Sequence, residues 1–361
     1  MTTATAYNLP IVYAGPIEEW NTCYSRLMAL REIESKVSVF DTCPYFKGCP
    51  NTFLQKIARK FSFSGRSYAQ ANSDFLALCQ REQPKIVWID KGDWLWPSTL
   101  RSLRSSGAFL AQHCTDALNP CHWGTWLVMR LLRQTLPFYD LYFTSNLNDY
   151  AALRGRRDPH AELTFLGFDH RRLNHEPLSP ELAAKWSNDL LFVGHYEPHT
   201  EAGILALKDA GLQVSVYGRT WNRAAQKRRL RGIVDCRQLD LPEYHYALKG
   251  AKIGLGFISK WNCNQTAGRS FEIPASGTFL LAMRSQQHLD CYKEGEEAEF
   301  FDNTNELVQK AKRYLTHETE RQQIARRGHD RCVASDYSWA RYMRDDWAKT
   351  KAHYEAFRDK R

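Results

Sequence analysis

Short apolar runs alternate along this chain with longer segments whose apolar residues recur every three or four positions. Apolar runs of four to six residues indicate buried strands, and helical spacing indicates amphipathic helices. In the first half the pattern predicts strands at Leu9–Ala14, Val37–Asp41, Lys85–Ile89, Ala108–Gln112, Leu141–Thr144 and Leu163–Leu166. In the second half it predicts strands at Leu190–Val193, Val214–Tyr217, Ile233–Asp235, Ile253–Phe257 and Phe279–Ala282.

Helical patterns fill the intervals between these strands. In the second half they fall at 200–210, 221–230, 243–250 and 269–276, and three longer ones follow at 304–315, 318–333 and 338–358. Strands alternating with helices are typical of parallel α/β sheets. The proline-containing stretch 171–180 reads as a linker. We therefore expect two α/β domains, at 1–175 and 176–336, and a C-terminal helix at 337–361.

Composition narrows the class of ligand. The 361 residues include 49 Lys and Arg against 40 Asp and Glu, a net charge of +9. This excess suits an anionic ligand or surface. The segment Met1–Asn8 is polar and has neither the basic n-region nor the apolar h-region of a signal peptide. No apolar run is long enough to span a bilayer. We expect a cytoplasmic protein with at most peripheral contact to the inner face of the membrane.

The ten cysteines are scattered and form no CxxC pair. A disulfide framework is not expected in a chain of this length without an export signal. Cys114 and Cys121 lie near His113 and His122, but their spacing fits no common zinc pattern. The sequence therefore predicts buried thiols here and no metal site.

The stretch from Gly268 to Leu281 carries the most specific chemistry. It predicts a helix start, a short amphipathic helix, a glycine stop and a buried strand, with Arg269 at the helix mouth and Glu272 one turn in. Backbone amides at a helix start attract phosphate, and a nearby carboxylate can accept both hydroxyls of a ribose. The alternative is an ordinary turn in which Glu272 is solvated and Gly277 only caps the helix.

The second half resembles the donor-binding domain of GT-B glycosyltransferases, and most closely the CgeB-like (spore maturation protein-like) group, which is also described as family-1-type. The resemblance lies in Leu191–Gly194, in Val214–Gly218 with Trp221, in Ala251–Phe257, in Arg269–Leu281 and in Gly295–Leu307. It covers about 190–340 well and continues more weakly into 85–175. It implies a GT-B fold, in which two Rossmann-like domains face a central cleft and the C-terminal helix crosses back onto the N-terminal domain. It also implies that 1–175 is the acceptor side and 176–336 binds the nucleotide sugar.

The resemblance also implies donor contacts. Glu272 would hold the ribose, with Gly268, Arg269 and Ser270 beside the diphosphate. The retaining GT-B group has a second glutamate where this chain has Asn264, and many members have an arginine where it has His195. We expect the remaining donor contacts from the ends of strands, at Gly15, His195, Gly218, Arg219, Lys260 and Asn264.

Candidates for the reaction itself lie in the first domain. His113 ends a strand and corresponds to a histidine that often touches the donor sugar in related enzymes; the alternative is an interior histidine. Asp116 and Asp93 are candidate general bases, with Asp90 as a further one, although aspartates at such positions more often cap loops. No Asp-x-Asp lies at a strand end, so the sequence favours metal-independent chemistry.

The sequence thus predicts a glycosyltransferase that moves a sugar from a nucleotide diphosphate sugar, with UDP-sugar favoured, to a hydroxyl of a polysaccharide, lipid-linked glycan or protein. Retention is slightly favoured, and no further cofactor is expected. Three alternatives stay open: an enzyme that glucosylates modified DNA, a catalytically silent nucleotide- or glycan-binding protein, and a nucleotide-sugar epimerase.

Overall fold

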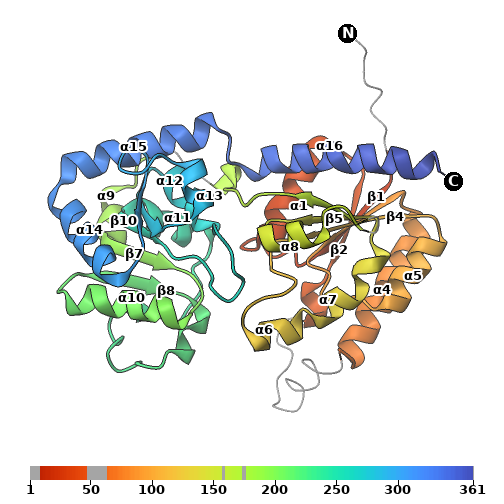
Figure 1. The fold of residues 1–361 in the computed structure, drawn as a ribbon, viewed down its shortest axis with the longest axis horizontal. Helices are drawn as coiled ribbons and strands as arrows, with labels where there is room; N and C mark the ends of the chain where they lie inside the picture. Colours follow the sequence, from red (N-terminus) through yellow and green to blue (C-terminus); the bar gives the residue numbers. More distant parts are fainter. Residues whose placement is uncertain (1–8, 47–62, 157–158, 173–175, 361) are drawn as a thin grey trace, which may run out of the picture. The chain divides into compact units, whose positions relative to one another are not determined.

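A computed structural model describes residues 9–46, 63–156, 159–172 and 176–360 (Figure 1). The chain forms two compact units. Unit 1 comprises the chain up to Phe165 together with Trp261–Cys263 and Trp339–Arg361, and unit 2 comprises Leu166–Lys260 and Asn264–Ser338. The expected linker at 171–180 lies within unit 2, and its residues 173–175 are outside the described residues, as is the polar segment Met1–Asn8.

Unit 1 is built on six parallel strands in the order β2-β1-β3-β4-β5-β6. Its strands are β1 (Ile11–Gly15), β2 (Val37–Asp41), β3 (Ile86–Asp90), β4 (Phe109–Cys114), β5 (Leu141–Thr144) and β6 (His160–Leu163). Its longer helices are α1 (Thr22–Ile33), α4 (Arg66–Glu82), α5 (Pro97–Ser105) and α16 (Trp339–Arg358), and its shorter ones are α2 (Cys43–Phe46), α6 (Trp123–Val128), α7 (Arg130–Thr135), η1 (Leu136–Phe138) and α8 (Leu147–Leu153).

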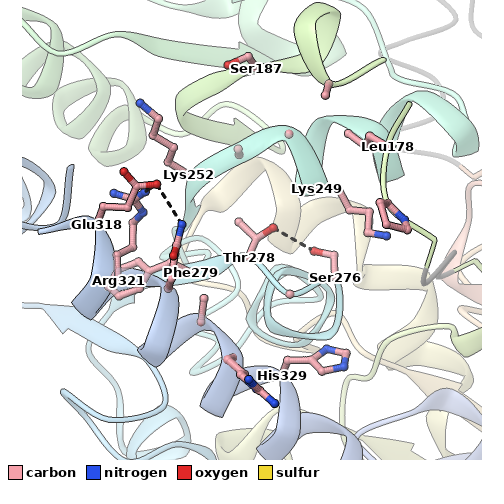
Figure 2. Close-up of a pocket in the computed structure, with 18 residues that line it drawn as sticks. Leu178, Ser187, Lys249, Lys252, Ser276, Thr278, Phe279, Glu318, Arg321 and His329 are labelled. Carbon is pink, nitrogen blue, oxygen red and sulfur yellow. Dashed lines mark hydrogen bonds and ion pairs between the residues drawn. The ribbon is translucent and has the colours of Figure 1, made fainter. Parts of the chain in front are cut away.

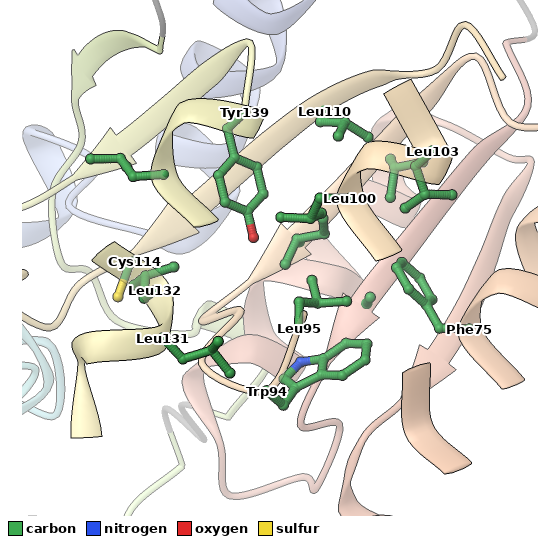
Figure 3. Packing of buried hydrophobic residues seen from close by; sticks show 14 of the residues in the cluster. Phe75, Trp94, Leu95, Leu100, Leu103, Leu110, Cys114, Leu131, Leu132 and Tyr139 are labelled. Carbon is green, nitrogen blue, oxygen red and sulfur yellow. The ribbon is translucent and has the colours of Figure 1, made fainter. Parts of the chain in front are cut away.

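Successive residues of a strand point to opposite faces of the sheet, and both faces of this sheet are apolar. Val12 and Ala14 join a core with α4, α5 and α7, and Figure 3 shows part of it, with Phe75, Leu100 and Leu131. On the other face, Ile11 and Tyr13 pack with residues of α1 and α16, among them Leu27, Leu30, Met343 and Trp347. The C-terminal helix is therefore part of the core of unit 1.

Unit 2 repeats this plan with six parallel strands in the order β12-β11-β10-β7-β8-β9. Its strands are β7 (Asn188–Val193), β8 (Val214–Tyr217), β9 (Val234–Asp235), β10 (Ala251–Gly256), β11 (Phe279–Met283) and β12 (Glu299–Phe301). Its helices are η2 (His170–Arg172), α9 (Pro180–Trp186), α10 (Pro198–Asp209), η3 (Arg219–Arg223), α11 (Leu241–Gly250), α12 (Arg269–Ala275), α13 (Gln286–Cys291), α14 (Thr304–Thr316) and α15 (Glu318–Ala334).

The predicted α/β class and most predicted strands are confirmed, and the differences lie at sheet edges. The strand predicted at Leu163–Leu166 is wrong in position, because the chain pairs earlier, as β6. Side chains of this edge strand are half-buried or exposed, so it lacks the apolar run that marks the inner strands. The short edge strand β12 was not predicted. No described helix combines the length and the apolar character that crossing a bilayer requires.

The helix predicted at 221–230 is also wrong. Only the 3-10 turn η3 forms, and residues 225–232 continue as turns. The carboxylate of Glu201, a buried residue of α10, accepts hydrogen bonds from the backbone N–H groups of Ala225 (3.2 Å) and Gln226 (2.7 Å). A helix would need these N–H groups for its own carbonyls. The side chain of Glu201, 24 residues away in sequence, thus binds the N–H groups that a helix would use, and the predicted helix does not form.

Candidate functional site

Glu272 lies in the first turn of α12, with its carboxylate held from two sides. The hydroxyl of Tyr244 on α11 donates to Oε2 over 2.6 Å, and Nη1 of Arg269 lies 3.5 Å from the same oxygen. Burial and the negative charge of Glu272 hold the pKa of the Tyr244 phenol above its ordinary value, so this hydroxyl stays a donor. Within the described part of the chain no partner contacts Oε1. The side chain is 18% exposed, so a positioned carboxylate oxygen remains available to a ligand.

Gly268 lets this carboxylate lie directly against the backbone. A Cβ atom at this position would come within 3.3 Å of Oε2 and 3.5 Å of Oε1 of Glu272. The distance of 3.5 Å is an ordinary contact, but the one of 3.3 Å would require the carboxylate to move by a few tenths of an ångström. Gly268 therefore contributes space beside Glu272.

The start of α12 offers fewer amides than the sequence led us to expect. The N–H group of Ser270 already donates to the carbonyl of Ala267, and those of Phe271 and Glu272 donate to the carbonyl of Gly268. The helix has only seven residues. A phosphate near this point would depend mainly on the side chain of Arg269, which is 33% exposed.

Ser270 faces the interior and is fully buried. Its hydroxyl accepts the N–H of Ala267 (3.0 Å) and pairs with Nε2 of His288 (2.6 Å), while Nδ1 of His288 lies 2.7 Å from the carbonyl oxygen of Met283. These contacts leave the hydroxyl no opening toward a ligand. Ser270 instead fastens the start of α12 to α13. His288, which sequence reasoning missed, has no local motif that would have marked it.

His195 and Arg219 follow the adjacent strands β7 and β8, and both side chains are exposed. Nδ1 of His195 lies 3.4 Å from the hydroxyl of Thr220, and Nη2 of Arg219 donates to Oε1 of Gln238 over 2.5 Å. Gly218 lies between them in sequence, where a Cβ atom would come within 2.1 Å of the carbonyl oxygen of Gly194. The two turns therefore pack backbone to backbone, which brings His195 and Arg219 to neighbouring positions.

Lys260 and Asn264 follow β10 and are linked to a carboxylate that sequence reasoning missed. Glu197, a buried residue after β7, accepts the N–H of Lys260 (3.1 Å) and the hydroxyl of Ser259 (2.5 Å). The N–H of Asn264 donates to the carbonyl of Ser259 over 3.2 Å. Glu197 thus organises the loop after β10, and the side chain of Lys260 is exposed there.

In unit 1, Asp116 and Asp93 follow β4 and β3, whose ends lie side by side. Burial lowers the pKa of the Lys91 ammonium, but the charges of Asp116 and Asp93 act the other way, and the pKa is raised overall. Lys91 adopts a left-handed φ of 68°. The two candidate bases therefore share one cationic neighbour, Lys91, that the sequence analysis did not identify.

Gly15 and His113 are enclosed in unit 1. A Cβ atom on Gly15 would come within 3.0 Å of Cβ of Asp90, so this glycine makes room for the end of β3. His113 is fully buried and stacks against Trp88, with ring centroids 6.0 Å apart. His113 is thus an interior histidine in this structure, and a contact with a sugar would require its ring to leave the core.

Asp90 is also a structural residue. Its carboxylate is fully buried and binds Arg26 through two hydrogen bonds of 2.7 Å each, and it accepts the Tyr13 hydroxyl over 2.6 Å. Burial raises the pKa of Asp90, but Arg26 outweighs it and lowers the pKa to about 2. A carboxylate held this firmly in its ionised form is a poor proton acceptor at neutral pH.

The expectation of a free thiol at Cys121 is wrong, because Cys121 forms a disulfide with Cys263. Cys263 belongs to the segment Trp261–Cys263 of unit 1, in which Trp261 stacks on His122 with centroids 4.3 Å apart. Asn262 of this segment donates to Oδ1 of Asp116 over 3.2 Å. Cys114 is a buried thiol, as expected. In the described residues no three His, Cys, Asp or Glu side chains converge as metal ligands.

Residues 201–345 match the sequence profile of the family described as "Glycosyl transferase-like", a match that includes Tyr244, Arg269 and Glu272. It spans about two fifths of the chain. No curated protein sequence matches.

Solved structures extend the likeness to nearly the whole chain. Sucrose-phosphate synthase from Thermosynechococcus elongatus has a TM-score of 0.69 at 12% identity, over 96% of this chain and 100% of its own. Anabaena HepE in complex with UDP and glucose has a TM-score of 0.65 at 12% identity, over 95% and 99%. The trehalose-6-phosphate synthase OtsA has a TM-score of 0.63 at 12% identity, over 95% and 99%. These likenesses confirm the predicted GT-B fold, and the family match supports a glycosyltransferase.

Proposed function

We propose that this GT-B chain transfers a sugar from a nucleotide diphosphate sugar to an acceptor hydroxyl. The observation that carries the proposal is the Glu272 carboxylate, which Tyr244 and Arg269 hold at Oε2 while Oε1 stays available. A carboxylate is an acceptor only, and it suits a pair of ribose hydroxyls, which are donors. UDP is the favoured nucleotide, since HepE, which shares the fold, was solved with UDP and with UDP-glucose.

The diphosphate would be bound by cations that are partly or fully exposed. Arg269 lies beside Glu272 and is our first candidate, and Arg219 and Lys260 follow strand ends of the same sheet. Arginine binds phosphate through two parallel hydrogen bonds. The amide of Asn264 would contact a hydroxyl of the sugar. Gly268, Gly218 and His195 would contribute backbone space and a further polar contact.

In the proposed reaction the acceptor oxygen forms a bond to the anomeric carbon, and the bond from that carbon to the diphosphate oxygen breaks. Negative charge then develops on the diphosphate, where Arg269 would stabilise it without a metal ion. The acceptor proton must leave. Asp116 and Asp93 are the candidates to accept it if the configuration inverts, and in a retaining reaction, which we slightly favour, the leaving phosphate itself can take the proton.

A binding experiment tests the role of Glu272. Wild type is titrated with UDP and with 2′,3′-dideoxy-UDP, and both titrations are repeated with Glu272→Gln. Wild type should prefer UDP by about 1.5–3 kcal/mol, the usual value of a hydrogen bond to a charged group, which is roughly a 10- to 150-fold difference in Kd. Glu272→Gln should lose most of this preference.

Glu320→Gln, an exposed glutamate of α15, is the matched control and should behave as wild type. Equal affinity of wild type for the two nucleotides would remove Glu272 from ribose recognition.

A turnover experiment separates the remaining alternatives. Sugar release from UDP-glucose is measured alone, with glycan and protein acceptors, and with duplex DNA. Acceptor-dependent transfer to a glycan, lipid-linked glycan or protein supports the proposal. Transfer to DNA would favour the DNA-modifying alternative, and interconversion of the sugar without an acceptor would indicate an epimerase. Tight nucleotide binding without any turnover would indicate a silent binding protein.

A further inference from the structure

A cavity of about 740 Å³ opens at the edge of the unit 2 sheet where the strands begin (Figure 2). Ser187 precedes β7, and Ala251 and Phe279 are the first residues of β10 and β11. Residues of α9, α11 and α15 complete the walls. The donor candidates His195, Arg219 and Lys260 follow the opposite ends of the strands. The cavity therefore lies at the amino ends of the strands, and the proposed nucleotide site lies at their carboxyl ends.

The lining of this cavity is strongly basic. It contains one carboxylate, Glu318, against four cations, Lys249, Lys252, Arg321 and Arg326. Figure 2 shows Lys249 on one side and Lys252 with Glu318 and Arg321 on the other. Lys252 pairs with Asp189 outside the lining over 2.7 Å, but the side chains are 49% and 34% exposed. Exposed pairs of this kind contribute little, so a ligand could recruit Lys252 at small cost.

Arg321 is the buried cation of the lining, and the protein compensates its charge only weakly. Its side chain is only 6% exposed, and Nη1 donates to the carbonyl oxygen of Tyr314 over 2.6 Å. Its nearest carboxylate, Glu318, is 3.6 Å from Nη2 and is itself 67% exposed. A buried guanidinium is costly unless a counter-charge stays close. One turn and a half further along α15, Arg326 is exposed and forms no ion pair with any residue in the described ranges.

Two hydroxyl groups of the lining, on Ser276 and Thr278, can accept hydrogen bonds from a ligand. The hydroxyl of Ser276 donates to the carbonyl of Ile273 over 2.8 Å and lies 3.4 Å from the hydroxyl of Thr278, which donates to the carbonyl of Leu248 over 2.6 Å. Each hydroxyl has its proton committed and retains acceptor capacity. Leu178, Ala183 and Phe279 of the lining are apolar. The cavity thus combines cations with hydroxyl acceptors and an apolar wall.

We propose that this cavity binds a small polyhydroxylated phosphate ester of the sugar-phosphate class. The phosphate lies against Arg321, Arg326 and Lys252, and ligand hydroxyls donate to Ser276 and Thr278. The volume falls in the range of ordinary small-molecule sites. This site is separate from the nucleotide site and does not depend on the proposed transfer reaction.

Calorimetric titration of the full chain tests the proposal, with glucose 6-phosphate, glucose and inorganic phosphate as probes at constant ionic strength. Glucose 6-phosphate should bind at least tenfold more tightly than glucose or inorganic phosphate. The double variant Lys252→Ala/Arg326→Ala removes two exposed side chains, so it should fold normally and bind glucose 6-phosphate at least tenfold more weakly. Arg327→Ala, next to Arg326 but outside the lining, is the matched control and should bind within twofold of wild type.

Saturating UDP should leave the affinity for glucose 6-phosphate unchanged. Displacement by UDP would put the sugar phosphate in the nucleotide site and overturn the proposal. Absence of binding to wild type, or equal binding to the double variant, would also overturn it. Equal affinity for inorganic phosphate would contradict the role of the hydroxyl acceptors. None of these outcomes depends on whether the chain transfers sugar.

Discussion

His113 on β4 and Asp346 on α16 form a buried pair. The pKa of each is shifted by burial, and the two shifts should change the stability of unit 1 with pH in opposite directions. Nε2 of His113 lies 3.7 Å from Oδ2 of Asp346. Burial, reinforced by the charge of Arg26 and opposed by Asp90, lowers the pKa of His113 from 6.5 to about 3. Burial also raises the pKa of Asp346 from 3.8 to about 7, against the hydrogen bond from Thr164. Both groups are therefore neutral in the folded protein near pH 5.

The two shifts act on stability with opposite sign. The folded pKa of His113 is depressed, so its contribution is present above pH 6.5 and is lost as pH falls toward 3. The folded pKa of Asp346 is raised, so its contribution is present below pH 3.8 and is lost as pH rises toward 7. Since one pKa unit equals about 1.4 kcal/mol, each group alone changes the free energy of unfolding by about 4–5 kcal/mol across its window. Between pH 4 and 6.5 the two effects cancel.

Single substitutions should uncover the separate slopes. From pH 5.0 to 6.5, Asp346→Asn should gain about 1.4 kcal/mol of stability per pH unit relative to wild type, and His113→Phe should lose about as much. Asp345→Asn removes a neighbouring carboxylate that is 56% exposed, and it should keep the wild-type slope.

Urea unfolding followed by tryptophan fluorescence measures these slopes. The signal reports mainly unit 1, which contains Trp20, Trp88, Trp94, Trp96, Trp123, Trp126, Trp261, Trp339 and Trp347 of the 11 tryptophans. Equal pH slopes for wild type, Asp346→Asn and His113→Phe would refute the reasoning.

Three further predictions concern other parts of the chain. Arg269→Ala should lower turnover at least tenfold and leave the melting temperature within a few degrees, as kinetics and calorimetry would show; a large fall in Tm with normal kinetics would make this arginine structural. His288→Ala removes the imidazole partner of the buried Ser270 hydroxyl and should lower the free energy of unfolding by about 1–3 kcal/mol in urea titrations, and an unchanged value would contradict the pairing. Peptide mass mapping without reductant should recover Cys121 and Cys263 as one linked pair, and alkylation of both thiols would exclude that bond.

The inner strands of both sheets could be predicted because they are buried on both faces and so appear as continuous apolar runs. Leu141–Thr144, an inner strand buried at every residue, has the predicted limits. Val214–Tyr217, which is half-buried at alternate residues, and the edge strand Val37–Asp41 also have the predicted limits. β6 and β12 lie at sheet edges, where burial is incomplete or the strand is short, and their signal is correspondingly weak. The error at 221–230 has another cause, since the buried carboxylate of Glu201 captures N–H groups that a local pattern assigns to a helix.

The candidate site could be located from the sequence, but its contacts could not. Arg269 and Glu272 are neighbours on one helix turn, and spacing predicts their proximity. Tyr244, which fixes Glu272, is 28 residues away in sequence, and only the folding of unit 2 brings its hydroxyl to that carboxylate. Burial also places one expected donor contact, Ser270, in the interior. Ser270 matched the expected motif by sequence, yet its side chain faces the core.

The crystal structure of the full chain with bound UDP-glucose tests the central claim most directly. The account predicts the ribose hydroxyls within hydrogen-bond distance of Oε1 of Glu272 and the diphosphate beside the guanidinium of Arg269. A nucleotide bound with its ribose away from Glu272, or a site at α12 that stays empty at saturating donor, would contradict it.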